Sequence, residues 1–149
     1  MATSVKSVRG NLYEADFVVW AEAQAEALRA GRLDALDREH LAEEIEGLAE
    51  RDRRELRSRL RVLVTHLLKW QYRPDHRSGS WRATIHAQRA DLEDLFESSP
   101  SLRREVPDVL AGVYPRAVKG AAEETGLPPG TFPKACPFSP EQVLGDWLP

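Results

Sequence analysis

Apolar side chains recur at helical spacing along most of the chain, and the strongest run extends from about residue 37 to residue 72. Leu41, Leu56 and Leu63 are among the residues that fall near one face of this run. Pro74 follows and would end the helix. A helix of about 35 residues is roughly 52 Å long, more than a compact chain of this size spans. We therefore expect it to bend near Gly47 or to pack against a second copy rather than to overhang.

Shorter helices are predicted on both sides of this run. Asn11 and Glu14 have the spacing of a capping pair, and apolar residues at helical spacing follow as far as Gly31, which predicts a helix over about 12–30. After the long helix, residues 78–80 form an N-cap, and the periodicity predicts a helix that ends near Ser98.

A further helix is expected between Pro100 and Gly126, and Pro107 and Pro115 should break or kink it. Proline punctuates residues 127–149, where only one short helix is expected, at Ser139. Four side chains of this tail should anchor it to the other helices: Phe132, Phe138, Trp147 and Leu148.

No segment alternates polar and apolar residues as a strand does. We therefore predict an all-α fold, an antiparallel helical bundle with one long central helix and an irregular, proline-rich C-terminal tail. The length of 149 residues suits a single helical domain over 1–149, with residues 1–10 flexible and residues 127–149 packed on the bundle.

Composition narrows the class of protein. Hydrophobic residues make up 42% and charged residues 30% of the chain, which is typical of a folded globular protein. No apolar run is long enough for a membrane span, and the N-terminus lacks the apolar core of a signal peptide. Cys136 is the only cysteine, so an internal disulfide is excluded. A cytoplasmic protein is expected.

The formal net charge of −3 conceals a segregation along the chain. Residues 1–50 carry 5 basic and 11 acidic side chains, residues 51–89 carry 11 and 3, and residues 90–149 carry 5 and 10. The basic middle could bind a polyanion or pair with its own acidic flanks, and the second interpretation is favoured because the whole chain is negative.

Several short motifs occur together in an order that resembles one protein family. They are Leu12-Tyr13-Glu14-Ala15-Asp16-Phe17 with Trp20, Leu41-Ala42-Glu43-Glu44-Ile45-Glu46, His66-Leu67-Leu68-Lys69-Trp70-Gln71-Tyr72, Ser80-Trp81-Arg82-Ala83-Thr84-Ile85, Cys136-Pro137-Phe138 and Trp147-Leu148-Pro149. This set resembles the family called domain of unknown function 29, a group of uncharacterised bacterial proteins. The resemblance implies a helical architecture over nearly the whole chain and implies no activity.

The turn between residues 69 and 82 combines cations, aromatic rings and a helix N-terminus, which are the groups that bind anions. The candidate anion-binding residues are Lys69, Arg73, Arg77, Ser80, Trp81 and Arg82. Alternatively the turn is an ordinary capped turn, whose tryptophans are core and whose arginines pair with acids elsewhere in the chain.

The long helix carries Glu39, Glu43 and Glu46 on a row that continues with Arg57 and Arg61. Acids near the start of a helix and bases further on suit the helix dipole, so a solvated face explains the row. Antiparallel pairing of two copies would set acid against base, and this is the basis for expecting a homodimer.

Candidates for acid or base catalysis are few: Glu43, Glu44 and His66. His40 with these three residues suggests a metal site, but no Glu-x-x-His motif occurs, so we expect no metal and no cofactor. Cys136 is interpreted as a packing residue rather than a catalytic thiol. The arginines of residues 51–61 spread around their helix, which argues against nucleic acid as a partner.

These observations favour a non-enzymatic binding or interaction module, with a small anionic ligand or a protein partner at the basic and aromatic turn. Two alternatives remain. One is an enzyme acting on a phosphorylated or nucleotide substrate, which requires Glu44 or His66 to share a cavity with the arginines of the turn. The other is a structural homodimer without a ligand.

Overall fold

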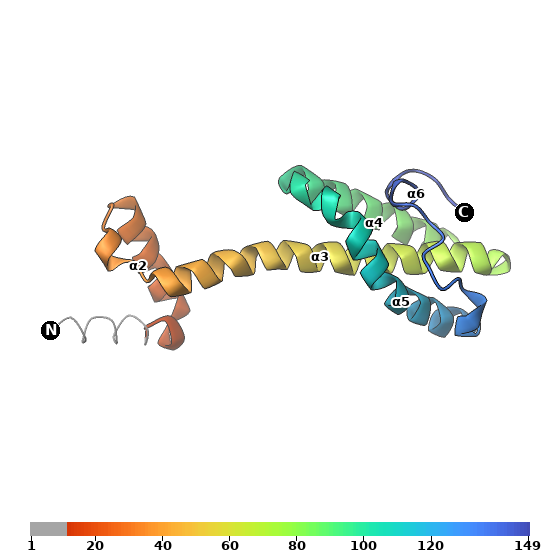
Figure 1. The fold of residues 1–149 in the computed structure, drawn as a ribbon, viewed down its shortest axis with the longest axis horizontal. Coiled ribbons are helices and arrows are strands. Elements are labelled where there is room, and N and C mark those ends of the chain that lie inside the picture. Colours follow the sequence, from red (N-terminus) through yellow and green to blue (C-terminus); the bar gives the residue numbers. More distant parts are fainter. Residues whose placement is uncertain (1–11) are drawn as a thin grey trace. The chain divides into compact units, whose positions relative to one another are not determined.

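A computed structural model describes residues 12–149, which form helices and contain no strand (Figure 1). The chain divides into two compact units, one ending at Glu50 and the other comprising Arg51–Pro149, and each is described by itself. The all-α prediction with one long helix is confirmed, and the single-domain prediction stays a prediction. The expected flexibility of residues 1–10 and the cap at Asn11 lie outside the described residues.

The first unit begins with residues 12–15, which are helical, and with α2 (Phe17–Arg29). The expected single helix over 12–30 is interrupted at Asp16, whose side chain accepts a hydrogen bond from the Val19 N–H and caps α2. Gly31 has a φ of 70°, in the left-handed region that glycine tolerates best. A short 3₁₀ helix, η1 (Leu33–Ala35), leads to the next helix.

Polar contacts fasten α2 to the start of α3 (Arg38–Tyr72). Trp20 Nε1 donates to Asp37 Oδ2 at 3.1 Å, and the Asp37 N–H donates to Gln24 Oε1 at 2.7 Å. Trp20 and Gln24 are buried, together with Ala27. Asp37 therefore holds the two helices of this unit together through its side chain and its N–H. Its backbone carbonyl accepts the first hydrogen bond of α3, from the Leu41 N–H.

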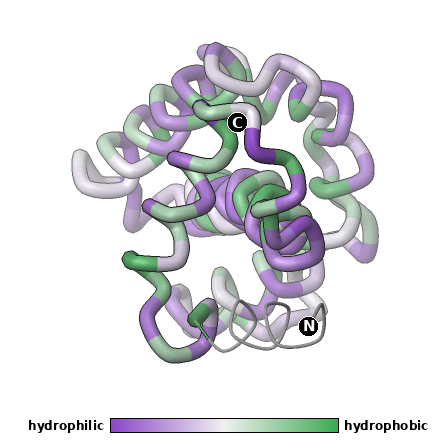
Figure 2. The backbone as a smooth tube through the Cα atoms, turned by 90° about the vertical axis from the view of Figure 1, so that its left-hand side faces the viewer, coloured by the Kyte–Doolittle hydropathy of each residue, from purple (hydrophilic) through white to green (hydrophobic). Residues whose placement is uncertain are grey.

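The long helix predicted over about 37–72 is confirmed, and it continues through Gly47 without interruption. In the second unit its side chains meet those of α4 (Gly79–Ser98) and α5 (Val106–Thr125), which lie alongside it in Figure 1. The fully buried residues that α3 contributes are Leu56, Leu60, Leu63, Val64, Leu67 and Leu68. Figure 2 shows hydrophobic and hydrophilic residues following one another along the backbone, and helices that contain both kinds can bury one face.

The helices of the second unit begin and end as their sequences indicate. Ser78 caps α4 by accepting from the Trp81 N–H, and Gly126 ends α5 with a φ of 74°. A 3₁₀ helix, η3 (Pro100–Glu105), precedes α5. The helix expected between Pro100 and Gly126 is divided into η3 and α5 next to Pro107, as predicted, and Pro107 lies in the first turn of α5, where the missing N–H costs little. Pro115 lies inside α5 and does not interrupt it.

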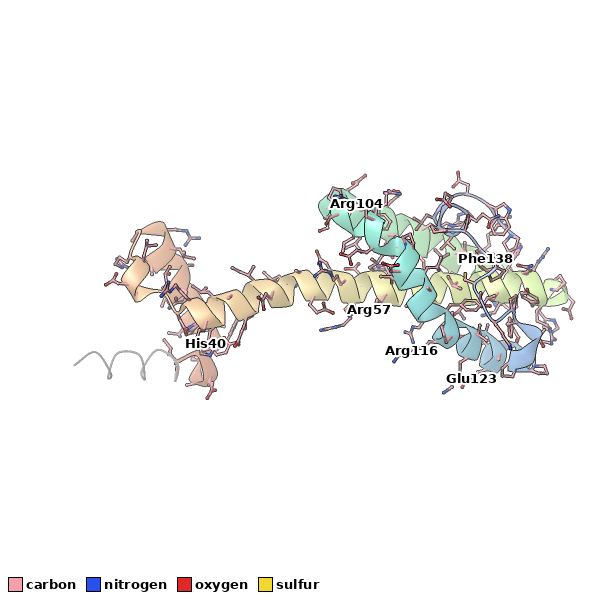
Figure 3. All side chains as sticks on the ribbon, in the orientation of Figure 1. His40, Arg57, Arg104, Arg116, Glu123 and Phe138 are labelled. Carbon is pink, nitrogen blue, oxygen red and sulfur yellow. The ribbon has the colours of Figure 1, made fainter. Side chains whose placement is uncertain are left out.

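The C-terminal tail packs back on the second unit. It contains η4 (Pro129–Thr131) and α6 (Pro140–Leu144), whose capping box of Ser139 and Gln142 confirms the predicted short helix. Phe132 and Phe138 are buried as expected, whereas Trp147 remains 38% exposed. Phe138 lies among the side chains of this unit in Figure 3.

Arg89 on α4 secures the end of this tail. Its guanidinium donates to the carbonyl oxygens of Gln142, Val143 and Trp147 at 2.7 to 3.1 Å. The last carbonyls of a helix have no partner within it, so the arginine supplies the donors that α6 lacks. Burial lowers the pKa of this guanidinium, which still carries its charge because arginine is not deprotonated in proteins.

Candidate functional site

The predicted anion-binding turn surrounds η2 (Pro74–His76). Lys69 is 6% exposed, its Nζ lies 2.7 Å from Glu124 Oε2, and it sits 4.5 Å from the centre of the Trp81 ring. A lysine held by a carboxylate and a ring face has little remaining capacity for an external anion. Its acid partner belongs to α5, 55 residues along the chain.

The arginines of the turn also have partners inside the protein. Arg73 Nη1 donates to the Thr125 carbonyl at 3.2 Å, and its Nε lies 3.5 Å from Asp75. Arg77 Nε donates to the Trp70 carbonyl at 2.8 Å, with the guanidinium 5.1 Å from the centre of the Trp70 ring. These contacts stabilise the turn itself.

Two predicted residues remain at the surface. Arg82 is exposed and lies 6.0 Å from the Trp70 ring, and Ser80 is exposed in the first turn of α4. The structure brings the six predicted residues to one region of the second unit, and most of their cations are engaged there by the protein. Anion binding at this turn stays a prediction.

The catalytic candidates do not form one site. Glu44 belongs to the first unit, where it accepts a hydrogen bond from the Tyr13 hydroxyl, while Glu43 is exposed. That hydrogen bond, followed by burial, raises the pKa of Tyr13 to about 12. His66 belongs to the second unit, where its Nδ1–H donates to the Val62 carbonyl at 2.9 Å and burial lowers its pKa. None of these hydrogen bonds joins Glu44 or His66 to the arginines of the turn.

A histidine and aspartate pair that the sequence analysis did not single out lies at the start of α3 (His40 is labelled in Figure 3). His40 Nδ1 is 2.6 Å from Asp37 Oδ2, and the Tyr13 ring stacks on the imidazole with centroids 3.9 Å apart. The hydrogen bond to Asp37 raises the pKa of His40. Burial of Asp37 acts to raise its pKa, but hydrogen bonds from His40 and Trp20 act in the other direction, and the pKa lies below the ordinary value of an aspartate. Asp37 and His40 are three residues apart at the start of a helix, and this spacing is the sequence signal from which their contact could have been predicted.

This pair should make the stability of the first unit depend on pH. Because the folded pKa of His40 is raised, its stabilisation is fully present below the unfolded value of about 6.5 and is lost as pH rises through the folded pKa. The difference in melting temperature between wild type and a His40→Gln variant should therefore be larger at pH about 6 than at about 8. A difference that is constant with pH would show that His40 is not charged in the folded pair.

Exposed apolar side chains concentrate in the first unit. Among the described residues, those that are large, hydrophobic and exposed are Phe17, Val18, Val19, Leu28, Leu33, Ile45 and Leu48, and in the second unit only Trp147. We call the seven residues of the first unit the docking surface. Leu33 is 71% and Ile45 is 65% exposed, so these side chains gain nothing from the hydrophobic core of the folded chain.

The basic stretch of α3 is partly paired within the second unit. Arg53 forms an ion pair with Glu105 at 3.2 Å, and Arg59 forms one with Asp91 at 2.6 Å. Acidic residues that follow residue 90 therefore neutralise some of the basic charge, as expected. Four other arginines of this stretch are exposed: Arg51, Arg54, Arg57 and Arg61.

An apolar groove with a volume of about 470 Å³ lies between α5 and the tail. Its lining includes Leu110, Tyr114, Pro115 and Cys136. Burial raises the pKa of the Cys136 thiol, whose Sγ is 3.5 Å from the Phe138 carbonyl. A thiol with a raised pKa is a poor nucleophile at neutral pH, which fits the packing role expected for Cys136.

No group of three or more His, Cys, Asp or Glu side chains in residues 12–149 could hold a metal ion. None of its helices combines the length and the apolar character needed to cross a bilayer.

A known protein family matches almost the whole chain. The family described as Domain of unknown function DUF29 matches residues 12–148. The chain belongs to this family. The match confirms the resemblance noted in the sequence and includes both units of this DUF29 chain. No curated protein and no solved structure matches it.

Proposed function

We propose that this DUF29 chain is a non-enzymatic interaction module whose docking surface binds another protein chain. The observation that carries the proposal is the concentration of exposed large apolar side chains in residues 17–48. The second unit, by contrast, buries nearly all of its large apolar side chains. Large exposed hydrophobic side chains that are concentrated in one part of a folded protein mark interaction sites, because leaving them in water is unfavourable.

The local structure of the first unit supports this proposal. Trp20 and Gln24 on α2 each form a hydrogen bond with Asp37 at the start of α3, so the unit has a defined fold although few of its residues are buried. A surface held by such contacts loses little conformational entropy when a partner binds, which favours affinity.

The alternative of an enzyme has less support. Its acid and base candidates, Glu44 and His66, each bind a group near them and lie in different units. Three of the four cations expected to bind a phosphorylated substrate, Lys69, Arg73 and Arg77, are engaged by Glu124, Thr125 and Trp70. We therefore place the function at the docking surface.

Site-specific photo-crosslinking in cells would test the proposal. A photoreactive phenylalanine analogue at Val18 or Ile45 should give a covalent adduct of discrete mass, because these exposed positions lie in the docking surface. The control is the same analogue at Glu123, which is exposed on α5 and points away from it in Figure 3. Equal yields at all three positions, or no adduct at Val18 and Ile45, would contradict the proposed function.

A further inference from the structure

The charge around the docking surface restricts what can bind there. Residues 12–50 carry eleven Asp or Glu and three Arg, a net charge of −8. Like charges brought together across an interface oppose association, so the same acidic surface of another copy cannot be its sole counterpart. Anionic partners such as nucleic acids are disfavoured for the same reason. The counterpart must be basic.

A basic counterpart exists on the same chain. Residues 51–61 of α3 carry six arginines and two acids. Arg51, Arg54 and Arg61 are exposed, and no ion pair or hydrogen bond engages their side chains among the described residues. This basic stretch can therefore accept carboxylates from another molecule without first breaking an ion pair of those three arginines.

The order of charges along α3 determines how two copies would pair. Residues 38–50 carry five Glu and one Arg, so an antiparallel alignment of two α3 helices puts the acidic part of each opposite the basic part of the other. A parallel alignment would put acid opposite acid and base opposite base. Ile45 and Leu48 lie near the change of sign and share one helix face, so in the antiparallel alignment they lie opposite the beginning of the basic stretch of the second copy, whose arginine side chains have apolar stems.

We propose that the partner of the docking surface is a second copy of this chain, which pairs in antiparallel orientation so that the acidic residues of each copy bind the basic stretch 51–61 of the other. This inference rests on the proposed function. The resulting interface is two-fold symmetric, and each contact is made twice, once from each copy. Contact of Ile45 and Leu48 with the apolar stems of the arginines supplies affinity, and the alternation of charge selects the orientation.

Charge reversal on the full-length protein tests the pairing. By sedimentation equilibrium the wild type should dimerise. Two double variants, Glu43→Lys with Glu46→Lys and Arg54→Glu with Arg61→Glu, should each raise the dimer Kd by roughly tenfold or more, because like charges then face each other. An equimolar mixture of the two double variants should form a heterodimer, because the reversed charges are again complementary.

The matched control is Arg116→Glu with Lys119→Glu, which reverses two exposed charges on α5 and should leave the Kd unchanged. Heterodimer formation by the mixture supports the proposal, since loss of folding in either variant could not produce it. A dimer that is insensitive to both reversals, or a wild type that stays monomeric at high concentration, overturns it.

Identification of the photo-crosslinked adduct by mass spectrometry separates this inference from the proposed function. An adduct between two copies of this chain supports both. An adduct with a different protein, such as one carrying a basic amphipathic helix, overturns the second-copy inference and leaves the proposed function standing. Absence of an adduct contradicts the proposed function itself.

Discussion

Replacing Leu60 with alanine should lower the free energy of unfolding by about 3 kcal/mol, whereas Leu48→Ala should change it by less than about 0.5 kcal/mol. Both leucines belong to the same helix, but Leu60 is fully buried and Leu48 is 55% exposed. Removal of the Leu60 side chain loses buried apolar surface and leaves a cavity, whereas Leu48 loses contact mainly with water. Urea denaturation of both variants at low protein concentration would measure the difference.

Leu48→Ala serves as the matched control in this experiment, because the chemical change and the helix are the same. At high protein concentration the same substitution should destabilise the proposed dimer. Equal losses for the two variants in the monomer would mean that Leu48 is buried within the chain, and the docking surface would then lose one of its residues.

Substitution of Arg89 by methionine should lower the free energy of unfolding by about 3 kcal/mol or release the tail from α4, because a charged hydrogen bond contributes roughly 1.5 to 3 kcal/mol to stability. Methionine retains an apolar stem and removes every donor to the carbonyls of Gln142, Val143 and Trp147. Hydrogen exchange of residues 139–149 would distinguish local release from global destabilisation, and denaturation would give the free energy.

The control for Arg89 is Arg116→Met, which removes an arginine that is exposed on α5 and points away from it (Figure 3). This substitution should change the free energy of unfolding by less than about 0.5 kcal/mol. If Arg89→Met were as mild as the control and left the exchange of residues 139–149 unchanged, the apolar anchors Phe132 and Phe138 would be sufficient to hold the tail.

Most helices of this protein could be predicted because their ends carry local chemical signals. Ser78, Ser139 and Gly126 act within one turn of their own positions, so the sequence contains the whole interaction. The interruption at Asp16 was missed because its apolar neighbours continue the helical period, while its carboxylate caps the next turn. Periodicity reports which residues share a face and is insensitive to a single capping residue.

The apolar face of α3 shows a second limit. Leu48 and Leu60 belong to the same periodic run, yet one is exposed and the other is buried. Periodicity identifies an amphipathic helix but not what covers its apolar face, since the covering residues lie on α4 and α5, far along the chain.

Prediction of the site was limited for the same reason. The turn of residues 69–82 could be identified as basic and aromatic, but the partners of Lys69 and Arg73 are Glu124 and Thr125, more than 50 residues away. Whether those cations face a ligand or the protein depends on the packing of α5 against α3. The docking surface was missed because exposure of an apolar side chain is a property of the fold and not of the residue.

The different surroundings of the two parts of α3 have a consequence for evolution. Substitutions at Leu60, Leu63 and Leu67 are restricted to side chains of similar volume, because a change there affects the folding of every molecule. Ile45 and Leu48 are free of that restriction within one chain, so under the proposed function selection at these positions acts through the partner. Related chains should therefore keep the volume of the first group constant, while substitutions at the second group should be accompanied by compensating changes on the surface that binds it.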